Sequence, residues 1–125
     1  MIKIFNRTFH AVLDYGVAIL LFISPWIIGI PADGGPYIVF LFAGVSILLM
    51  SILTDYPGGL LKRLPMQMHL EADFFLGLFL AISPWAFEFA DVTWVYHVGV
   101  GVFSMFAALF TKTAKDDLKQ QLQSN

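Results

Sequence analysis

Two pairs of ionisable residues, His10 with Asp14 and His69 with Asp73, are the side chains in this sequence best suited to chemistry. The spacing of four residues within each pair places both side chains on one face of a helix, within hydrogen-bonding reach of each other. Imidazole changes charge near neutral pH, and imidazole and carboxylate both bind metal ions. What the pairs do depends on the elements that position them.

Three interpretations of these four residues remain open from the sequence. In the first, which we favour because polar cross-links between membrane helices are common, each imidazole and carboxylate hydrogen-bonds to the other half of the chain or to a helix end. In the second, the two histidines and two aspartates surround zinc or a harder divalent ion. In the third, they form part of a proton or ion path. Because spacing alone does not show that the four side chains converge, we expect no cofactor, with a divalent metal on His10, Asp14, His69 and Asp73 as the alternative.

Other kinds of chemistry find no support in the sequence. The chain contains no cysteine, which excludes thiol catalysis, disulfides and sulfur-based metal sites. It has no glycine-rich phosphate loop, no nucleophile elbow and no basic run suited to nucleic acid. His97 has no histidine counterpart elsewhere, and its place near a helix end predicts an interfacial side chain rather than a ligand. We therefore expect a protein that is not an enzyme and does not bind nucleic acid.

The composition indicates a membrane protein. Of the 125 residues, 58% are hydrophobic and 13% are charged, and the mean hydropathy is +0.78. Long uncharged runs predict four transmembrane helices near residues 9–30, 35–54, 68–89 and 93–112. An open sheet edge does not survive in hydrocarbon, and the alternating pattern of a barrel is absent, so the predicted fold is all-helical.

The charges predict the orientation of these helices. All seven basic residues fall on one side of the topology, before the first helix, between the second and third, and after the fourth. The connections on the other side carry only acidic residues among their charged ones, and all three tryptophans lie at that boundary. Excess Lys and Arg mark the cytoplasmic side, so both termini are expected in the cytoplasm.

The chain contains an internal repeat. An offset of 59 residues aligns 9–26 with 68–85 at 7 identical positions of 18, among them both His/Asp pairs. The second helices align at an offset of 57, which pairs Phe40 with His97, and also Gly44 with Gly101 and Thr54 with Thr111, small or short residues on one helical face where backbones could approach closely. This predicts two tandem, parallel helical hairpins related by a pseudo-twofold axis along the membrane normal. Five of the seven repeated identities share one helical face, which we expect to face the bundle interior, with Trp26 pointing away.

A Ser-Pro-Trp tripeptide ends the first helix of each repeat, as Ser24, Pro25 and Trp26 and again as Ser83, Pro84 and Trp85. Each proline should bend or end its helix, and the preceding serine can satisfy a backbone carbonyl that the proline leaves free. The doubled motif, with its fixed distance from the His/Asp pair, resembles the SPW repeat family of small membrane proteins over residues 9–112. The resemblance implies a prokaryotic, multi-pass protein of the inner membrane, and it implies no particular activity.

The sequence thus predicts one integral membrane domain over residues 1–125, with repeat 1 at about 9–54, repeat 2 at about 68–112 and a polar cytoplasmic tail over 113–125. The function we expect is that of a non-catalytic accessory or structural subunit of a larger membrane complex, or of a self-assembling module. Its partners would be the lipid bilayer and other membrane subunits or further copies of itself. The alternative is a small oligomeric transporter or channel that uses the two His/Asp pairs as proton, ion or metal sites.

Overall fold

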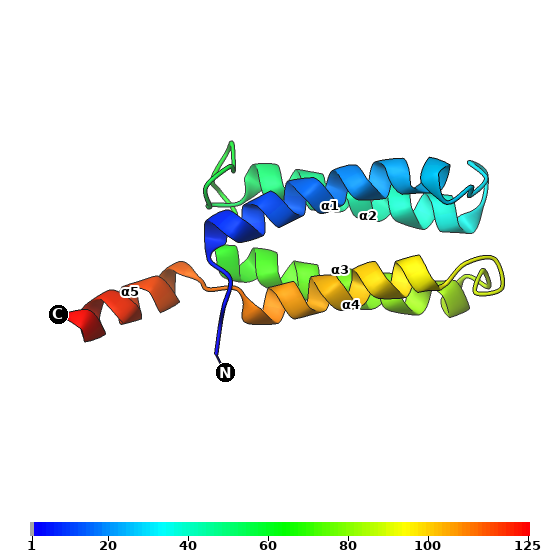
Figure 1. Cartoon of the computed structure of the whole chain (residues 1–125). Helices are drawn as coiled ribbons and strands as arrows, with labels where there is room; N and C mark the ends of the chain where they lie inside the picture. The colour runs from blue at the N-terminus through cyan, green and yellow to red at the C-terminus, as the bar shows by residue number, and fades with distance from the viewer. Residues whose placement is uncertain (1) are drawn as a thin grey trace.

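The computed structural model describes residues 2–125 and contains five helices (Figure 1). They are α1 (Arg7–Ile27), α2 (Gly35–Leu53), α3 (Met66–Ala86), α4 (Val95–Phe110) and α5 (Ala114–Ser124). Two isolated backbone bridges are the only β-type pairings among residues 2–125, and they form no strand. The prediction of an all-helical fold is confirmed.

Helices α1 to α4 form two antiparallel hairpins that lie side by side (Figure 1). Helix α1 packs along α2 and helix α3 packs along α4, while α2 and α3 provide the main helix contact between the hairpins. The start of the chain, the connection between α2 and α3, and the end of α4 all lie at one end of the bundle (Figure 1). Side chains near the beginnings of α1 and α3 are therefore brought to the same level.

The helix boundaries differ by up to three residues from the predicted ones, for local reasons. Helix α1 begins at Arg7 because the Asn6 side chain caps it, accepting a 2.8 Å hydrogen bond from the Phe9 amide. Helices α1 and α3 each end two residues after their proline, at Ile27 and Ala86. In α3 the Ser83 hydroxyl donates to the Leu80 carbonyl at 2.8 Å, which is the carbonyl that Pro84 leaves without an amide partner. In α1 the Ser24 hydroxyl donates instead to the Leu20 carbonyl, so the expected bond forms in the second repeat and not in the first.

Two helices, α1 and α2, are long and apolar enough to cross a membrane, as judged by length and composition. Helix α3 is as long as α1, with 21 residues each, and α4 is a shorter apolar helix of 16 residues. Leu21 and Leu80, which are repeat equivalents, are fully buried between the hairpins, whereas Trp26 is 72% exposed. The repeated face therefore points inward and Trp26 points outward, as the sequence predicted.

Small residues allow α3 and α4 to approach closely. A methyl group added to Gly77 would lie 2.6 Å from the Gly101 carbonyl oxygen, and one added to Gly101 would collide with the backbone of Gly77. Gly99, two residues earlier in α4, faces open space. The small residue expected at position 101 for close helix packing is therefore needed there.

The pseudo-twofold relation extends to the segments that precede α1 and α3. Phe5 forms a bridge with Thr111, and its repeat equivalent Leu64 forms a bridge with Thr54. Three backbone hydrogen bonds of 2.8–2.9 Å join the first pair of segments, and three of 2.8 Å at equivalent positions join the second. The beginning of the chain therefore meets the end of α4 in the same way that the link between the repeats meets the end of α2.

Helix α5 leads away from the bundle and buries no residue (Figure 1). Thr113 and Asp116 form a reciprocal capping box at its start. The Lys3 ammonium donates to the Asp116 carboxylate at 2.7 Å, and this bond holds the pKa of Asp116 well below its usual range. The polar tail predicted from residue 113 is thus an exposed helix tied to the beginning of the chain.

Candidate functional site

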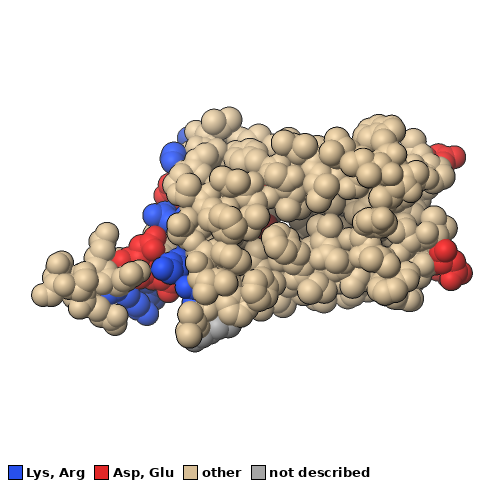
Figure 2. Space-filling model, viewed as in Figure 1, with Lys and Arg blue, Asp and Glu red and all other residues tan. Residues whose placement is uncertain are grey.

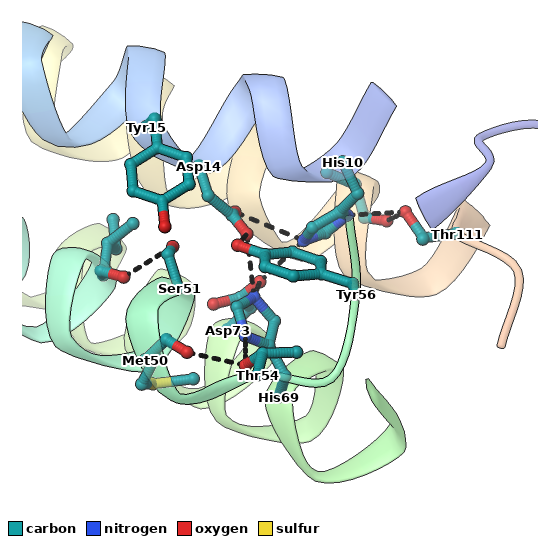
Figure 3. Close-up of polar contacts among 12 residues, drawn as sticks. His10, Asp14, Tyr15, Met50, Ser51, Thr54, Tyr56, His69, Asp73 and Thr111 are labelled. Carbon is teal, nitrogen blue, oxygen red and sulfur yellow. Dashed lines mark hydrogen bonds and ion pairs between the residues drawn. The ribbon is translucent and has the colours of Figure 1, made fainter. Parts of the chain in front are cut away.

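The two His/Asp pairs meet in one cluster between α1 and α3 (Figure 3). His10 Nε2 lies 3.3 Å from Asp14 Oδ1 and 2.9 Å from Asp73 Oδ2. His69 Nε2 lies 3.0 Å from Asp14 Oδ2 and 3.0 Å from Asp73 Oδ2. Each imidazole therefore faces one carboxylate of its own helix and one of the other repeat, which is the convergence that spacing alone did not show.

The cluster is closed off from the surface of the molecule. The exposed fractions are 1% for His10, 7% for Asp14, 0% for His69 and 4% for Asp73. Buried charges need partners, and here the partners are the other members of the cluster. Its residues lie near the beginnings of α1 and α3. Both helices begin at the end of the bundle where the chain starts (Figure 1).

Two threonines hold the outer nitrogen of each imidazole. The Thr111 Oγ1 lies 2.7 Å from His10 Nδ1, and the Thr54 Oγ1 lies 2.6 Å from His69 Nδ1. Each histidine thus contacts the threonine of the other repeat. The sequence indicated these threonines only as short residues that let helices approach, although a hydroxyl repeated at the same position of both second helices was a usable signal for a hydrogen-bond partner.

The direction in which each threonine hydroxyl donates its proton identifies the imidazole tautomer. The Thr54 hydroxyl donates its one proton to the Met50 carbonyl at 2.6 Å, and the Thr111 hydroxyl donates to the Ala107 carbonyl at 2.6 Å. A carbonyl oxygen only accepts, so each threonine oxygen must accept from the histidine. Both Nδ1 atoms therefore carry a proton, and both Nε2 atoms face the carboxylates with either a second proton or a lone pair.

Tyr56, in the connection between α2 and α3, is a further member of the cluster that the sequence did not predict. It is 1% exposed, and its hydroxyl donates to Asp14 Oδ2 at 2.7 Å (Figure 3). Burial, reinforced by the negative charge of Asp14, raises the pKa of the Tyr56 phenol above its usual range. The phenol therefore stays neutral and acts as a donor. A tyrosine in the connection between two helices carries no periodic signal that points to an interior position.

Two atoms of the cluster lack a hydrogen-bond partner among residues 2–125. His69 Nε2 is within 3.0 Å of two carboxylate oxygens but makes a hydrogen bond of acceptable geometry to neither, and Asp73 Oδ1 has no partner. A cavity of about 20 Å³ adjoins the cluster, and its lining includes Asp14, Asp73 and Ser104. This volume is about that of one water molecule or one small ion.

His97 is not an interfacial side chain, so that prediction is wrong. It is fully buried, its Nε2 lies 3.1 Å from the Pro36 carbonyl oxygen, and its ring stacks on Phe40 with centroids 3.8 Å apart. Phe40 is the repeat equivalent of His97, so the stacked pair lies on the pseudo-twofold axis. Position along a helix indicated the depth of this residue but not the face on which it lies.

The Ser-Pro-Trp residues do not join the cluster. They end α1 and α3, at the end of the bundle opposite the first residues of these helices. Ser83, Pro25 and Pro84 are buried, while Trp26 and Trp85 are 72% and 57% exposed. The motif therefore shapes the two corners of the fold, and the His/Asp/Thr cluster is the candidate functional site.

Apolar helices packed into a small bundle, with ionisable side chains gathered inside and apolar ones outside, define the class of small helical membrane proteins. Within this class, the sequence model of the SPW repeat domain matches residues 8–111. The match covers most of the 125 residues, and the chain belongs to the SPW repeat family. No curated protein and no solved structure matches it.

Proposed function

We propose that this protein is a non-catalytic module of the prokaryotic inner membrane that works through contacts with other membrane proteins or with further copies of itself. The observation that carries this proposal is the burial of its ionisable side chains inside the bundle. The His/Asp cluster is buried and tied across the two repeats, so it joins the hairpins and offers no side chain to a substrate outside. A catalytic group must reach the atoms that it acts on.

All four helices of the bundle cross the membrane in this proposal. Helix α3 has the length of α1, about 31 Å at 1.5 Å per residue. Its polar residues His69 and Asp73, which lower its hydropathy, face inward rather than toward lipid. Helix α4 spans about 24 Å, and local thinning of the bilayer accommodates a short span at modest cost.

The outer surface of the bundle supports a role in contacts. Large apolar side chains are exposed on all four helices, including Ile19, Ile23, Phe42, Leu49, Phe75, Ile82, Val102 and Phe106. Such a surface suits lipid tails and the apolar faces of neighbouring membrane helices. The closed interior and the apolar exterior together favour a module that assembles with other helices.

Charge at the two ends supports a cytoplasmic location for both termini. In Figure 2, basic side chains gather at the end of the bundle next to α5, whereas the opposite end shows acidic side chains only. The sequence places Lys62 and Arg63 at the first end, and Asp33 and Asp91 at the other. Excess Lys and Arg on the cytoplasmic side is the usual pattern of inner-membrane proteins.

The orientation can be tested cleanly because the chain has no cysteine. We expect Asp33→Cys to react with a membrane-impermeant maleimide added to intact cells, and Lys119→Cys to react only after the membrane is opened. The two variants serve as controls for each other. Labelling of Lys119→Cys in intact cells would contradict the topology.

The contact function is tested by gentle extraction from the native membrane through a tag on the C-terminus, followed by mass determination. We expect stoichiometric recovery within a larger assembly or as a homo-oligomer. Recovery as a partnerless monomer that conducts protons or ions in vesicles would refute the proposal.

A second candidate function, an oligomeric ion or proton conductor, is favoured by one observation. The cavity of about 20 Å³, which is lined by residues of all four bundle helices, reaches both carboxylates of the cluster. Replacing both aspartates of the cluster distinguishes a conductor from a contact module. A conductor carrying Asp14→Asn and Asp73→Asn should stay folded and lose pH-dependent flux, whereas a scaffold should lose stability or assembly.

A further inference from the structure

We propose that His10, Asp14, His69 and Asp73 bind one divalent transition-metal ion of the zinc class, through both Nε2 atoms and one oxygen of each carboxylate. The ligand atoms all lie within 4.8 Å of one another. The nitrogen–oxygen distances are 2.9–3.3 Å, with Asp73 Oδ2 facing both imidazoles, and Asp14 facing His10 with Oδ1 and His69 with Oδ2. Ligands about 2.0–2.1 Å from a tetrahedral zinc lie about 3.3 Å apart, so the cluster needs only small adjustments to surround the ion.

The threonines prepare the imidazoles for a metal. Each Nδ1–H is donated to a threonine hydroxyl, at 2.7 Å for His10 and 2.6 Å for His69. Metal-binding histidines almost always donate their other ring N–H to an oxygen, which fixes the ring orientation and directs the lone pair at the ion. Both histidines of this cluster have that arrangement, and both Nε2 atoms point to the same centre (Figure 3).

The orphaned atoms provide independent support. His69 Nε2 is completely buried and close to two carboxylate oxygens, yet its N–H direction meets neither of them as a hydrogen bond. Asp73 Oδ1 is likewise buried without a partner. An unpartnered buried polar atom is rare and costly, and a metal between the four side chains would satisfy the imidazole nitrogen.

A divalent ion also balances the charge of the cluster, since it replaces the two Nε2 protons by which the imidazoles would otherwise neutralise the carboxylates. Two buried carboxylates carry a formal charge of −2, and a carboxylate at the centre of a membrane helix costs on the order of 3 kcal/mol on insertion scales. With each Nε2 unprotonated, one divalent cation neutralises the site. The cluster includes no other basic side chain at salt-bridge distance among residues 2–125.

The type of ligand selects the zinc class over magnesium and calcium. Magnesium and calcium take six or more oxygen ligands, whereas this site offers two nitrogens and two carboxylates. Imidazole together with carboxylate in four-coordinate geometry suits zinc and its neighbours. The adjoining cavity of about 20 Å³ leaves room for one small ion or water molecule beside Asp14 and Asp73.

The test uses the full chain, purified in mild detergent and stripped of metal with a chelator. We expect calorimetric titration with Zn²⁺ to give one ion per chain with a Kd in the micromolar range or tighter. Co²⁺ should bind with the strong visible absorption of a tetrahedral site. A folded, stripped protein that takes up neither ion below about 1 mM would overturn the proposal.

Variants locate the ion. His69→Gln should weaken Zn²⁺ binding by at least about 100-fold, more than the 10–100-fold typical of an outer partner. His97→Gln is the matched control, since it changes a buried histidine outside the cluster whose amide replacement can still donate to the Pro36 carbonyl. It should bind as the unaltered chain does.

A fold check accompanies each variant, by circular dichroism and gel filtration. If His69→Gln does not fold, the titration of the unaltered chain and the Co²⁺ spectrum still decide the question. Zn²⁺ binding that survives in folded His69→Gln and Asp73→Asn variants would show binding to surface groups and refute the site. Because these readouts need no partner and no flux, they fail or succeed independently of the proposed contact function.

Discussion

Replacing Thr54 or Thr111 by valine tests the link between the two hairpins most directly. Valine has nearly the shape of threonine, so the change removes a hydroxyl without opening a cavity. It leaves a buried imidazole Nδ1–H without an acceptor, which costs about 1–3 kcal/mol. The two bonds are 2.6 and 2.7 Å long and both threonines are fully buried, so we expect the two substitutions to cost nearly the same.

This cost is measurable as a shift in thermal unfolding in mild detergent, followed by tryptophan fluorescence and circular dichroism. For a chain of this size, about 1 kcal/mol corresponds to roughly 4 °C in Tm, which predicts a fall of about 4–12 °C for each valine variant. The serine variants at the same positions keep the hydroxyl. They should recover most of the loss.

Ser46→Ala is the matched control on α2. The Ser46 hydroxyl donates to the Phe42 carbonyl at 2.8 Å, the same backbone bond that each threonine makes, but it contacts no histidine. We expect a change within about 0.5 kcal/mol, as for ordinary substitutions away from special contacts. If the valine variants lower Tm no more than Ser46→Ala does, the threonine–imidazole bonds do not stabilise the fold and the tautomer assignment loses its support.

Three further predictions follow from contacts described above. Gly101→Ala should destabilise the bundle by about 1–3 kcal/mol through overpacking, while Gly99→Ala, which faces open space, should be neutral or stabilising; thermal unfolding compares them. Tyr56→Phe should cost about 1.5–3 kcal/mol, since it removes a hydrogen bond to a buried carboxylate, and Tm measures this too. The contact of Asp116 with Lys3 should stabilise the position of α5 fully at pH values above the ordinary carboxyl pKa near 3.9. The contact should weaken as pH falls through the lower pKa of Asp116 in the folded state, and its loss should cost less than about 1 kcal/mol. A probe on α5 followed over pH and salt, with Asp116→Asn as the reference, measures this loss, and a signal independent of pH would contradict it.

Much of the helical architecture could be predicted because it depends on local patterns. The apolar runs gave four bundle helices to within three residues, and the offset of 59 gave the repeat that pairs His10 with His69. Helix periodicity correctly placed Leu21 inside and Trp26 outside. These features depend on neighbours within one or two helical turns, which a sequence displays directly.

The site could be predicted only in part because it depends on the rotation and approach of separate helices. Spacing put His69 and Asp73 on one face but did not show that this face meets the equivalent face of α1. Thr54 and Tyr56 reach the cluster through the chain connection after α2, whose path no periodic pattern encodes. His97 was misplaced for the same reason, since its face is set by packing against Phe40 in the other hairpin.

The two equivalent sets of backbone bonds at the ends of α2 and α4 have a consequence for connectivity. They close the bundle into a ring, because residues 4–5 meet residues 110–112 in the same way that the link between the repeats meets the end of α2. A circularly permuted chain, opened within residues 57–61 and joined between Lys3 and Thr113, should therefore reach the same fold. The order in which the membrane receives the two hairpins would then be reversed while the cluster between them stays the same.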